Sequence, residues 1–332
     1  MKDYSSIVVG SKVVLLRNLS GFNFPSMISG DEGIKVLNKL ADAVLKINSS
    51  FKLYKVKTLP ELDINIMHEK KLITSNLIDA CNYGAVVLSD DEQISIMINE
   101  SDHLCEQSIM KGLNLINAYD KLDAIDNQLL SKLDIAYDDS VGFLTSNISN
   151  IGTGLKASIT LFLPALTFTK KIASISASLI NQGYEFSSAL SEESYTYTVS
   201  NINTIGRRET DYVVKVTEIA IKLCEMEIRA RNELLSANYI DDIKDKVYRA
   251  WGVLTNCHKI SVSEAECLLG ELKTGVALDL IRFKDVDFIE NLMIDIMPYS
   301  LTKISNSTVT ISELDKYRAN FLSNVLKTKR IK

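Results

Sequence analysis

The chain has 332 residues, of which 46% are hydrophobic and 24% are charged, and its formal net charge is −5. This composition excludes a disordered chain and favours one or two folded domains. The acidic balance argues against a nucleic-acid binder, because such proteins neutralise phosphates with Lys and Arg. The most apolar stretch, Ala157–Phe168, is too short to span a bilayer, and the N-terminus lacks an apolar secretory core. We therefore expect a cytoplasmic protein with no membrane partner.

The five cysteines and three histidines have no spacing typical of a disulfide framework or a zinc site. We therefore expect reduced thiols and no metal-binding cluster.

The N-terminal half alternates strand and helix patterns. Residues Ile7–Leu16 predict a strand, and the turn formers of Asn18–Ser29 predict a loop. Apolar residues at helical spacing predict a helix over Asp31–Ile47. Two apolar segments, Ala85–Ser89 and Gln93–Asn99, flank an acidic turn and predict a hairpin.

The later segments indicate helices. Ile109–Leu133 and Ala157–Ile180 are interpreted as helices, the second packed beneath the sheet because it is more continuously apolar. A long helix is predicted from Thr210 to Ser236, followed by shorter helices with capping signals at Ser263 and Ser312.

Together these patterns predict an α+β fold, with a mixed, largely antiparallel sheet flanked by helices and then a small all-helical domain. We place the division at 1–237 and 238–332.

Four sequence blocks carry a resemblance to a known family. One ends in Asn99-Glu100-Ser101-Asp102-His103-Leu104-Cys105, which resembles the family pattern Asn-Glu-Glu-Asp-His-Leu-Arg. The others are Ser11–Asn18 (Ser-Arg-x-Arg-Leu-Ala-Arg-Asn), Leu144–Ser158 (ending in Gly-Thr-Gly-Leu-Arg-Ala-Ser) and Tyr197–Asn201 (Tyr-Gln-Ile-Ser-Asn). Their order along the chain is the family order, and together they resemble the ATP:guanidino phosphotransferases, or phosphagen kinases.

Two C-terminal segments point to one branch of this family. Leu268–Gly275 and Asp315–Ala319 look like the helical extension of the bacterial protein-arginine kinases. That resemblance implies ATP and Mg²⁺ as cofactors, arginine side chains of proteins as substrates, and a homodimer. It also implies partners: a heat-shock repressor, a Clp ATPase and a zinc-binding activator protein.

Family arginines that clamp the nucleotide phosphates fall on Lys12, Val14, Cys105, Lys156 and Ser187. Two of these five positions keep a positive charge. The resemblance also places the neighbouring residues Ser11, Ala157 and Ser158 in the nucleotide site. Arg207 and Arg208 are alternative cations that could compensate.

The family uses two carboxylates to hold and deprotonate the acceptor guanidinium. The first falls on Ser101, and Glu100 replaces it only if the backbone turns there. The second falls on Glu192, or on Ser188 without a gap, and Asn147 takes the place of a reactive cysteine.

Other residues allow two interpretations each. His103 favours a structural role. Gly152 and Gly154 either permit a tight turn or prepare an anion site at a helix starting near Lys156. Asp315 and Arg318 are spaced for an exposed ion pair. The resemblance instead implies a phosphoarginine pocket there.

Three functions follow. The first is a protein-arginine kinase whose altered site weakens or abolishes activity. The alternative is a pseudokinase that acts as a binding or regulatory partner in Clp-protease or heat-shock control. The third is a dimerisation partner of an active paralogue.

Overall fold

The computed structural model describes residues 4–80, 82–189, 194–236, 240–285, 288–306 and 309–331. The chain forms two compact units. The first comprises Met1–Leu161, Ser174–Ser187 and Thr198–Lys222, and the second Phe162–Ala173, Ser188–Tyr197 and Leu223–Lys332. The predicted division between 237 and 238 lies outside the described residues.

The main sheet has eight strands in the order β2-β3-β4-β5-β1-β8-β10-β9. Their bounds are β1 Val8–Arg17, β2 Lys52–Lys55, β3 Ala85–Leu88, β4 Ile94–Ile98, β5 Leu104–Lys111, β8 Leu155–Phe162, β9 Tyr184–Ser188 and β10 Thr196–Asn201. Strand β1 pairs antiparallel with both β5 and β8, and β3 with β4. A separate small sheet joins β6 Tyr137–Asp138 to β7 Gly142–Phe143. The predicted largely antiparallel sheet, the first strand and the hairpin are thus confirmed.

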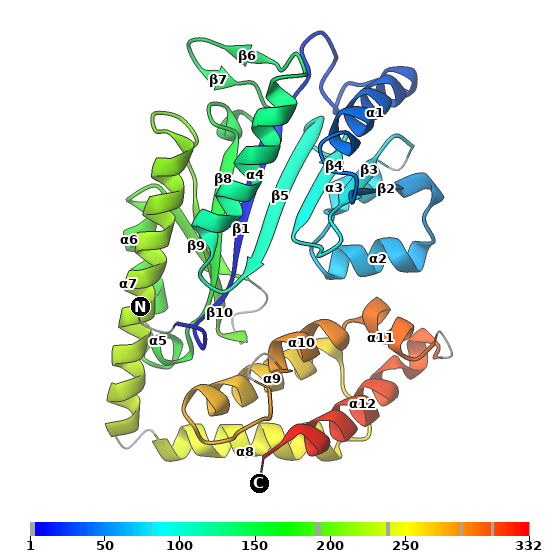
Figure 1. Cartoon of the computed structure of the whole chain (residues 1–332). Helices are drawn as coiled ribbons and strands as arrows, with labels where there is room; N and C mark the ends of the chain where they lie inside the picture. Colours follow the sequence, from blue (N-terminus) through cyan, green and yellow to red (C-terminus); the bar gives the residue numbers. More distant parts are fainter. Residues whose placement is uncertain are drawn as a thin grey trace. The chain divides into compact units, whose positions relative to one another are not determined.

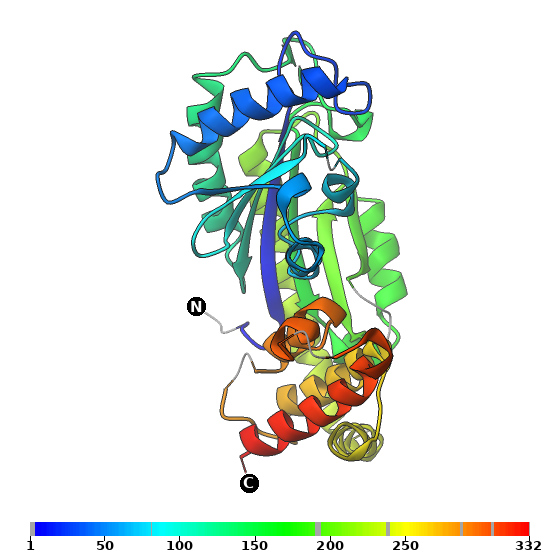
Figure 2. The ribbon, with the colours of Figure 1, turned by 90° about the vertical axis from the view of Figure 1, so that its right-hand side faces the viewer.

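Helices cover this sheet. Helix α1 (Gly30–Leu45) packs on β2, β3 and β4 (Figure 2), and α4 (Leu115–Leu130) lies along β1 and β5 (Figure 1). The apolar stripe of α1 is buried, and the Ser29 hydroxyl caps its N-terminus. The long helix α7 (Glu209–Ser236) is as predicted. The remaining helices before α7 are η1 Val56–Thr58, α2 Glu61–Glu69, α3 Ser75–Asp79, η2 Ile148–Asn150, α5 Pro164–Phe168 and α6 Ile172–Ile180.

The C-terminal part of the second unit is helical. It contains α8 Ile240–Asn256, α9 Val262–Ala277, α10 Phe288–Asp295, α11 Pro298–Ile304, η4 Ile311–Glu313 and α12 Leu314–Lys329. Helix α8 packs against α9 and α12 (Figure 1). Helix α9 is capped by Ser261, two residues before the predicted cap.

Two predicted helices are wrong. Residues 109–111 end strand β5, so the helix predicted from Ile109 begins only at Leu115. The segment predicted as a helix from Ala157 starts inside β8, followed by two short helices. In β8 buried and half-buried residues alternate, which is the period of a strand. The apolar run concealed this alternation.

Within the described segments, no helix combines the length and apolarity that crossing a membrane requires. The same segments hold no group of three His, Cys, Asp or Glu side chains that could bind a metal ion.

Candidate functional site

Five candidate residues share one face of the sheet. In the antiparallel register Lys12 lies opposite Ser158, Val14 opposite Lys156, and Leu16 opposite Cys105. Paired residues project to the same side, and alternate residues along β1 do so too. We call this side, defined by Lys12, Val14, Cys105, Lys156 and Ser158, the Lys12 face.

Ser11 and Ala157 project to the opposite side. The Ser11 hydroxyl donates to the carbonyl of Gly112 at 2.7 Å and is buried. Ala157 is buried, and its amide donates to the side chain of Asn201 at 2.7 Å. These two side chains support the sheet and do not reach the Lys12 face.

Lys12 is a half-buried cation. Burial lowers its pKa below the ordinary value, the charge of Lys71 lowers the pKa further, and the Glu100 carboxylate opposes this shift. Lys71 follows α2 with a left-handed φ of 60°, and its carbonyl accepts a 2.8 Å bond from the Gln107 side chain. Lys71 was not predicted as a site residue, because nothing in the local sequence pattern marks it as a neighbour of β1.

Lys156 is the second candidate cation. Its Nζ lies 3.4 Å from the carbonyl oxygen of Asn201 and 3.3 Å from that of Ile202. Burial lowers the pKa of Lys156, whereas the carboxylate of Glu185 raises it. Glu185 and Ser187 lie on the exposed side of edge strand β9, where the Ser187 hydroxyl is 3.5 Å from the Glu185 carboxylate.

An apolar cluster occupies the other end of the Lys12 face. Val14 packs against it, and Cys105 belongs to it and is 6% exposed. Burial raises the pKa of the Cys105 thiol far above its ordinary value, so this side chain carries no charge. The buried members of the cluster are Leu16, Val56, Leu72, Ile73, Leu77, Val86, Leu88, Met97 and Cys105. Positions 14 and 105 therefore offer a phosphate no cation.

The backbone turns after β4, which is the condition for Glu100 to replace Ser101. Asn99 has a left-handed φ of 57°, and its amide donates to the His103 carbonyl at 3.0 Å. The Glu100 carboxylate accepts a 2.6 Å bond from the Thr74 hydroxyl and another from the Ser101 amide. It lies close enough to Lys12 to raise the pKa of that lysine. The turn thus brings a carboxylate to the Lys12 face.

The two residues after Ser101 stabilise the loops. The Asp102 carboxylate accepts from the Asn18 side chain and the Ser146 amide, both at 2.6 Å, and burial raises its pKa. The His103 Nδ1 accepts from the Leu19 amide at 3.1 Å, and Nε2 lies 3.0 Å from the Asn23 carbonyl. Both ring nitrogens are used, which agrees with the structural role predicted for His103.

The Gly-Thr-Gly segment forms a turn. Gly152 and Gly154 have φ values of 113° and 64°, and a Cβ on Gly154 would lie 2.6 Å from the Leu16 carbonyl oxygen. Lys156 lies in β8, so the anion site predicted at a helix near Lys156 is wrong. Asn147 caps the short helix η2 through the Ser149 amide.

The second family carboxylate has two predicted positions, Glu192 and Ser188. Glu192 lies outside the described residues. Ser188 ends β9, and its buried hydroxyl has no hydrogen-bond partner in the described part of the chain.

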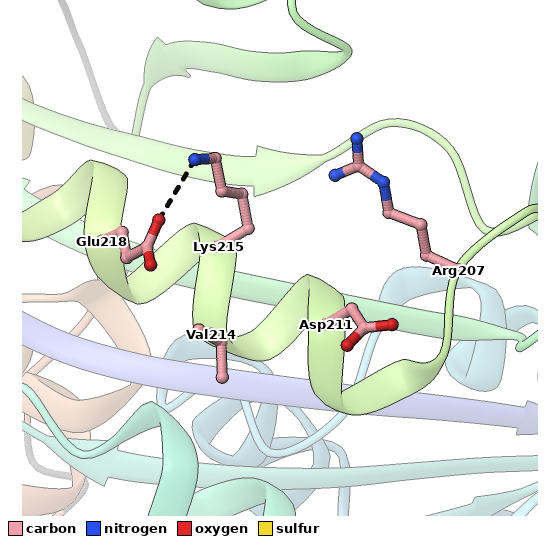
Figure 3. A pocket seen from close by; sticks show the side chains of 5 residues that line it. All are labelled: Arg207, Asp211, Val214, Lys215 and Glu218. Carbon is pink, nitrogen blue, oxygen red and sulfur yellow. Dashed lines mark hydrogen bonds and ion pairs between the residues drawn. The ribbon is translucent and has the colours of Figure 1, made fainter.

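The compensating arginines lie elsewhere in the first unit. Arg207 lines an open cavity of about 350 Å³ beside α7, and its guanidinium donates to the Tyr184 hydroxyl at 3.2 Å. Arg207 and Lys215 extend on the same side of the helix, and Lys215 pairs with Glu218 at 3.1 Å (Figure 3). Arg208 pairs with Asp211 at 3.3 Å. These arginines are engaged locally.

In the second unit, Asp315 and Arg318 form an ion pair at 2.6 Å. The Arg318 side chain is 1% exposed and the Asp315 side chain 51%, so the predicted exposed pair is wrong for its arginine. Arg318 also donates to the carbonyls of Ile296 at 2.9 Å and Ile260 at 2.8 Å. The Arg318 guanidinium therefore uses several of its N–H groups in bonds within the second unit.

Comparisons with known proteins agree with this architecture. Residues 34–230 match the ATP:guanido phosphotransferase, C-terminal catalytic domain, and residues 240–332 match the protein-arginine kinase McsB C-terminal domain. The chain is 33% identical over 331 residues to a protein-arginine kinase of Caldanaerobacter subterraneus subsp. tengcongensis, covering 97% of this chain and 98% of the relative. It is 34% identical to one from Moorella thermoacetica, covering 97% and 94%.

Solved structures share the fold. The substrate-free duplicated taurocyamine kinase from Schistosoma mansoni superposes with a TM-score of 0.63 at 22% identity, covering 74% of this chain and 38% of the longer duplicated chain. Lombricine kinase gives a TM-score of 0.61 at 20% identity, covering 73% and 70%. From the matched domains and these near full-length relatives, the chain belongs to the ATP:guanido phosphotransferase family, in its protein-arginine kinase branch.

Proposed function

We propose that this protein is a protein-arginine kinase relative with weak or no phosphoryl transfer, acting as a binding or regulatory partner in Clp-protease or heat-shock control. The observation that supports the proposal most strongly is the apolar cluster around Val14 and Cys105 on the Lys12 face. Phosphoryl transfer depends on cations and hydrogen-bond donors positioned around the transferring group. Neither of these residues supplies one.

The expected loss of rate is large. Removing one preorganised donor costs about 10²–10³ in rate, and removing a general base about 10²–10⁴. Such effects are not additive. Even so, the absence of an arginine at positions 14, 105 and 187 and of a carboxylate at position 101 should together remove most of the activity.

The family implies ATP and Mg²⁺, and the described residues fit this pair only in part. Lys12, Lys71 and Lys156 supply three lysines near the sheet, but their ammonium groups cannot form the bidentate contacts of arginine. Mg²⁺ in such sites is held mainly by the substrate phosphates and water. We therefore expect weak nucleotide binding.

The test pairs two measurements on the same purified chain: calorimetry with ATP and Mg²⁺, and an acid-labile phosphoarginine assay on casein. We expect binding to be weak or absent and transfer to be at background. The variants Lys12→Met and Lys156→Met should remove any residual binding, whereas Lys35→Met, at an exposed position on α1, should not. Transfer at the rate of complete family members would refute the proposal.

A second candidate is an active kinase. It is favoured by one observation, the Glu100 carboxylate that the turn after β4 brings near Lys12. In that case Glu100→Gln would abolish transfer while leaving ATP binding intact. If the parent protein transfers phosphate and Glu100→Gln does so equally well, the retained carboxylate is not the base.

The partners are proposed from the family. A heat-shock repressor, a Clp ATPase and a zinc-binding activator protein are the expected protein partners in the cytoplasm. Residues 238–332 are the expected dimerisation and phosphoarginine-binding domain. Light scattering on the full chain tests the homodimer, and calorimetry with free phosphoarginine tests Asp315 and Arg318. A monomer that binds no phosphoarginine would restrict the proposal to the catalytic domain.

A further inference from the structure

A buried cluster of acidic groups lies on the side of the sheet opposite the Lys12 face. At its centre the Arg17 guanidinium makes two bonds to the Asp126 carboxylate, from Nε at 3.2 Å and from Nη2 at 2.7 Å. Nη2 also donates to Glu209 at 3.1 Å, and the Tyr119 hydroxyl donates to the other Glu209 oxygen at 3.0 Å. The cluster joins β1, α4 and the first residue of α7.

Glu106 adds a further carboxyl group from β5. It is 0% exposed, and neither of its carboxylate oxygens has a hydrogen-bond donor in the segments that the structure describes. An ionised carboxylate offers only hydrogen-bond acceptors, so a buried one without donors is left unsatisfied.

Arg17 cannot neutralise this cluster alone. Its Nη1 donates to the carbonyls of Leu16 at 3.0 Å and Thr153 at 2.8 Å, and the guanidinium Cζ lies 3.7 Å from the centroid of the Phe143 ring. One guanidinium charge therefore faces three carboxyl groups, those of Glu106, Asp126 and Glu209. A proton on Glu106 would turn its carboxyl group into a donor and remove one negative charge.

We propose that Glu106 is protonated in the folded protein, and that loss of this proton as the pH rises weakens the packing of β5 against α4. The charged groups around Glu106 are Arg17 from β1, Asp126 from α4 and Glu209 from α7, and Tyr119 and Asp123 of α4 extend this hydrogen-bonded network. Burial raises the pKa of Glu106 well above its ordinary value, the Asp126 charge raises it further, and Arg17 opposes the shift.

The direction of the pH effect follows from linkage. The folded state holds this proton more tightly than the unfolded chain, in which Glu titrates near about 4.3. The stability that comes from this proton is therefore fully present below that value and is lost as the pH rises through the folded pKa of Glu106. Within this window the unfolding equilibrium constant rises up to about tenfold per pH unit.

Urea unfolding between about pH 5 and about pH 8 tests the proposal on the full chain. In the isosteric variant Glu106→Gln, the free energy of unfolding should change less with pH, by the amount that one titrating proton contributes. Glu61→Gln, at an exposed position on α2, should show the same pH dependence as the parent. An unchanged slope in Glu106→Gln would overturn the proposal.

Infrared spectroscopy gives a second test that does not depend on folding of the variant. The folded parent protein should show a protonated-carboxyl band near neutral pH that disappears on alkaline titration. In a folded Glu106→Gln variant the band should be missing. If the parent shows no such band, Glu106 is not protonated in the folded protein, whether or not the variant folds.

Discussion

The hydroxyl of Thr74 donates a 2.6 Å hydrogen bond to the carboxylate of Glu100 and also accepts a 3.3 Å bond from the Leu77 amide at the start of α3. One side chain thus caps a helix and holds the carboxylate of the turn after β4. Glu100 is 7% exposed, so its carboxylate relies on the Thr74 hydroxyl and the Ser101 amide as hydrogen-bond donors instead of on water.

We predict that Thr74→Val destabilises the protein by about 1–3 kcal/mol, because a buried carboxylate loses a donor and α3 loses its cap. Thr74→Ser keeps the hydroxyl and should cost much less. Urea denaturation at neutral pH measures both. Equal losses in the two variants would show that the methyl group, and not the hydroxyl, is what matters.

The sequence predicted the elements whose period was clear. The strand around Val8–Arg17, the hairpin of β3 and β4, and the long helix α7 all follow from regular apolar spacing. The segment Ala157–Phe162 was wrongly predicted as helix, because a continuous apolar run does not distinguish a buried strand from a helix. Only the alternating burial in the structure decides it.

The sequence predicted which residues form the candidate site, but not which side chains surround them. The motifs located Lys12, Val14, Cys105 and Lys156, and the register brings them to one face. No pattern in the sequence predicted that residues of α2 and α3 complete an apolar cluster there, or that Lys71 lies near Lys12. Both depend on contacts between residues that are distant in the chain.

The lowered pKa of Lys12 gives a second prediction. The folded protein holds this proton less tightly than the unfolded chain, so the parent gains stability as the pH rises toward the ordinary lysine pKa of about 10.4. Lys12→Met removes the buried charge and should be more stable than the parent near pH 7. The difference should shrink as the pH approaches about 10.

Urea unfolding as a function of pH measures this difference, with Lys35→Met as the matched control because Lys35 is exposed. If Lys12→Met proves less stable than the parent at neutral pH, attraction to Glu100 outweighs the cost of burying the lysine.

Cys105 should be chemically inert in the native state. Its thiol is 6% exposed and its pKa is raised by burial, whereas reactive cysteines are accessible thiolates. We predict that a thiol reagent labels Cys105 only at the rate of unfolding, and labels the half-buried Cys257 sooner. Peptide mapping by mass spectrometry separates the two sites. Rapid native labelling at Cys105 would mean that the apolar cluster opens readily.

Gly154 and Gly206 make a matched pair. Both have positive φ, 64° and 88°, but a Cβ on Gly154 would meet the Leu16 carbonyl oxygen at 2.6 Å, whereas a Cβ on Gly206 would meet nothing within 4 Å. Gly206→Ala should cost about 1–2 kcal/mol for the left-handed conformation alone. Gly154→Ala should cost clearly more, because the backbone must also move. Thermal and urea unfolding compare them, and equal costs would show that the turn relaxes without strain.

A buried ion pair and an exposed one of the same sequence spacing should contribute differently to stability. Arg318 pairs with Asp315 at 2.6 Å and Arg282 with Asp279 at 2.5 Å, but the arginine side chains are 1% and 68% exposed. Arg318 also donates to two backbone carbonyls, which a lysine cannot satisfy from one ammonium group. We expect Arg318→Lys to cost about 1–3 kcal/mol and Arg282→Lys less than about 0.5 kcal/mol in urea unfolding. If Arg318→Lys retains full stability yet loses affinity for phosphoarginine in calorimetry, the guanidinium serves ligand binding and not the fold.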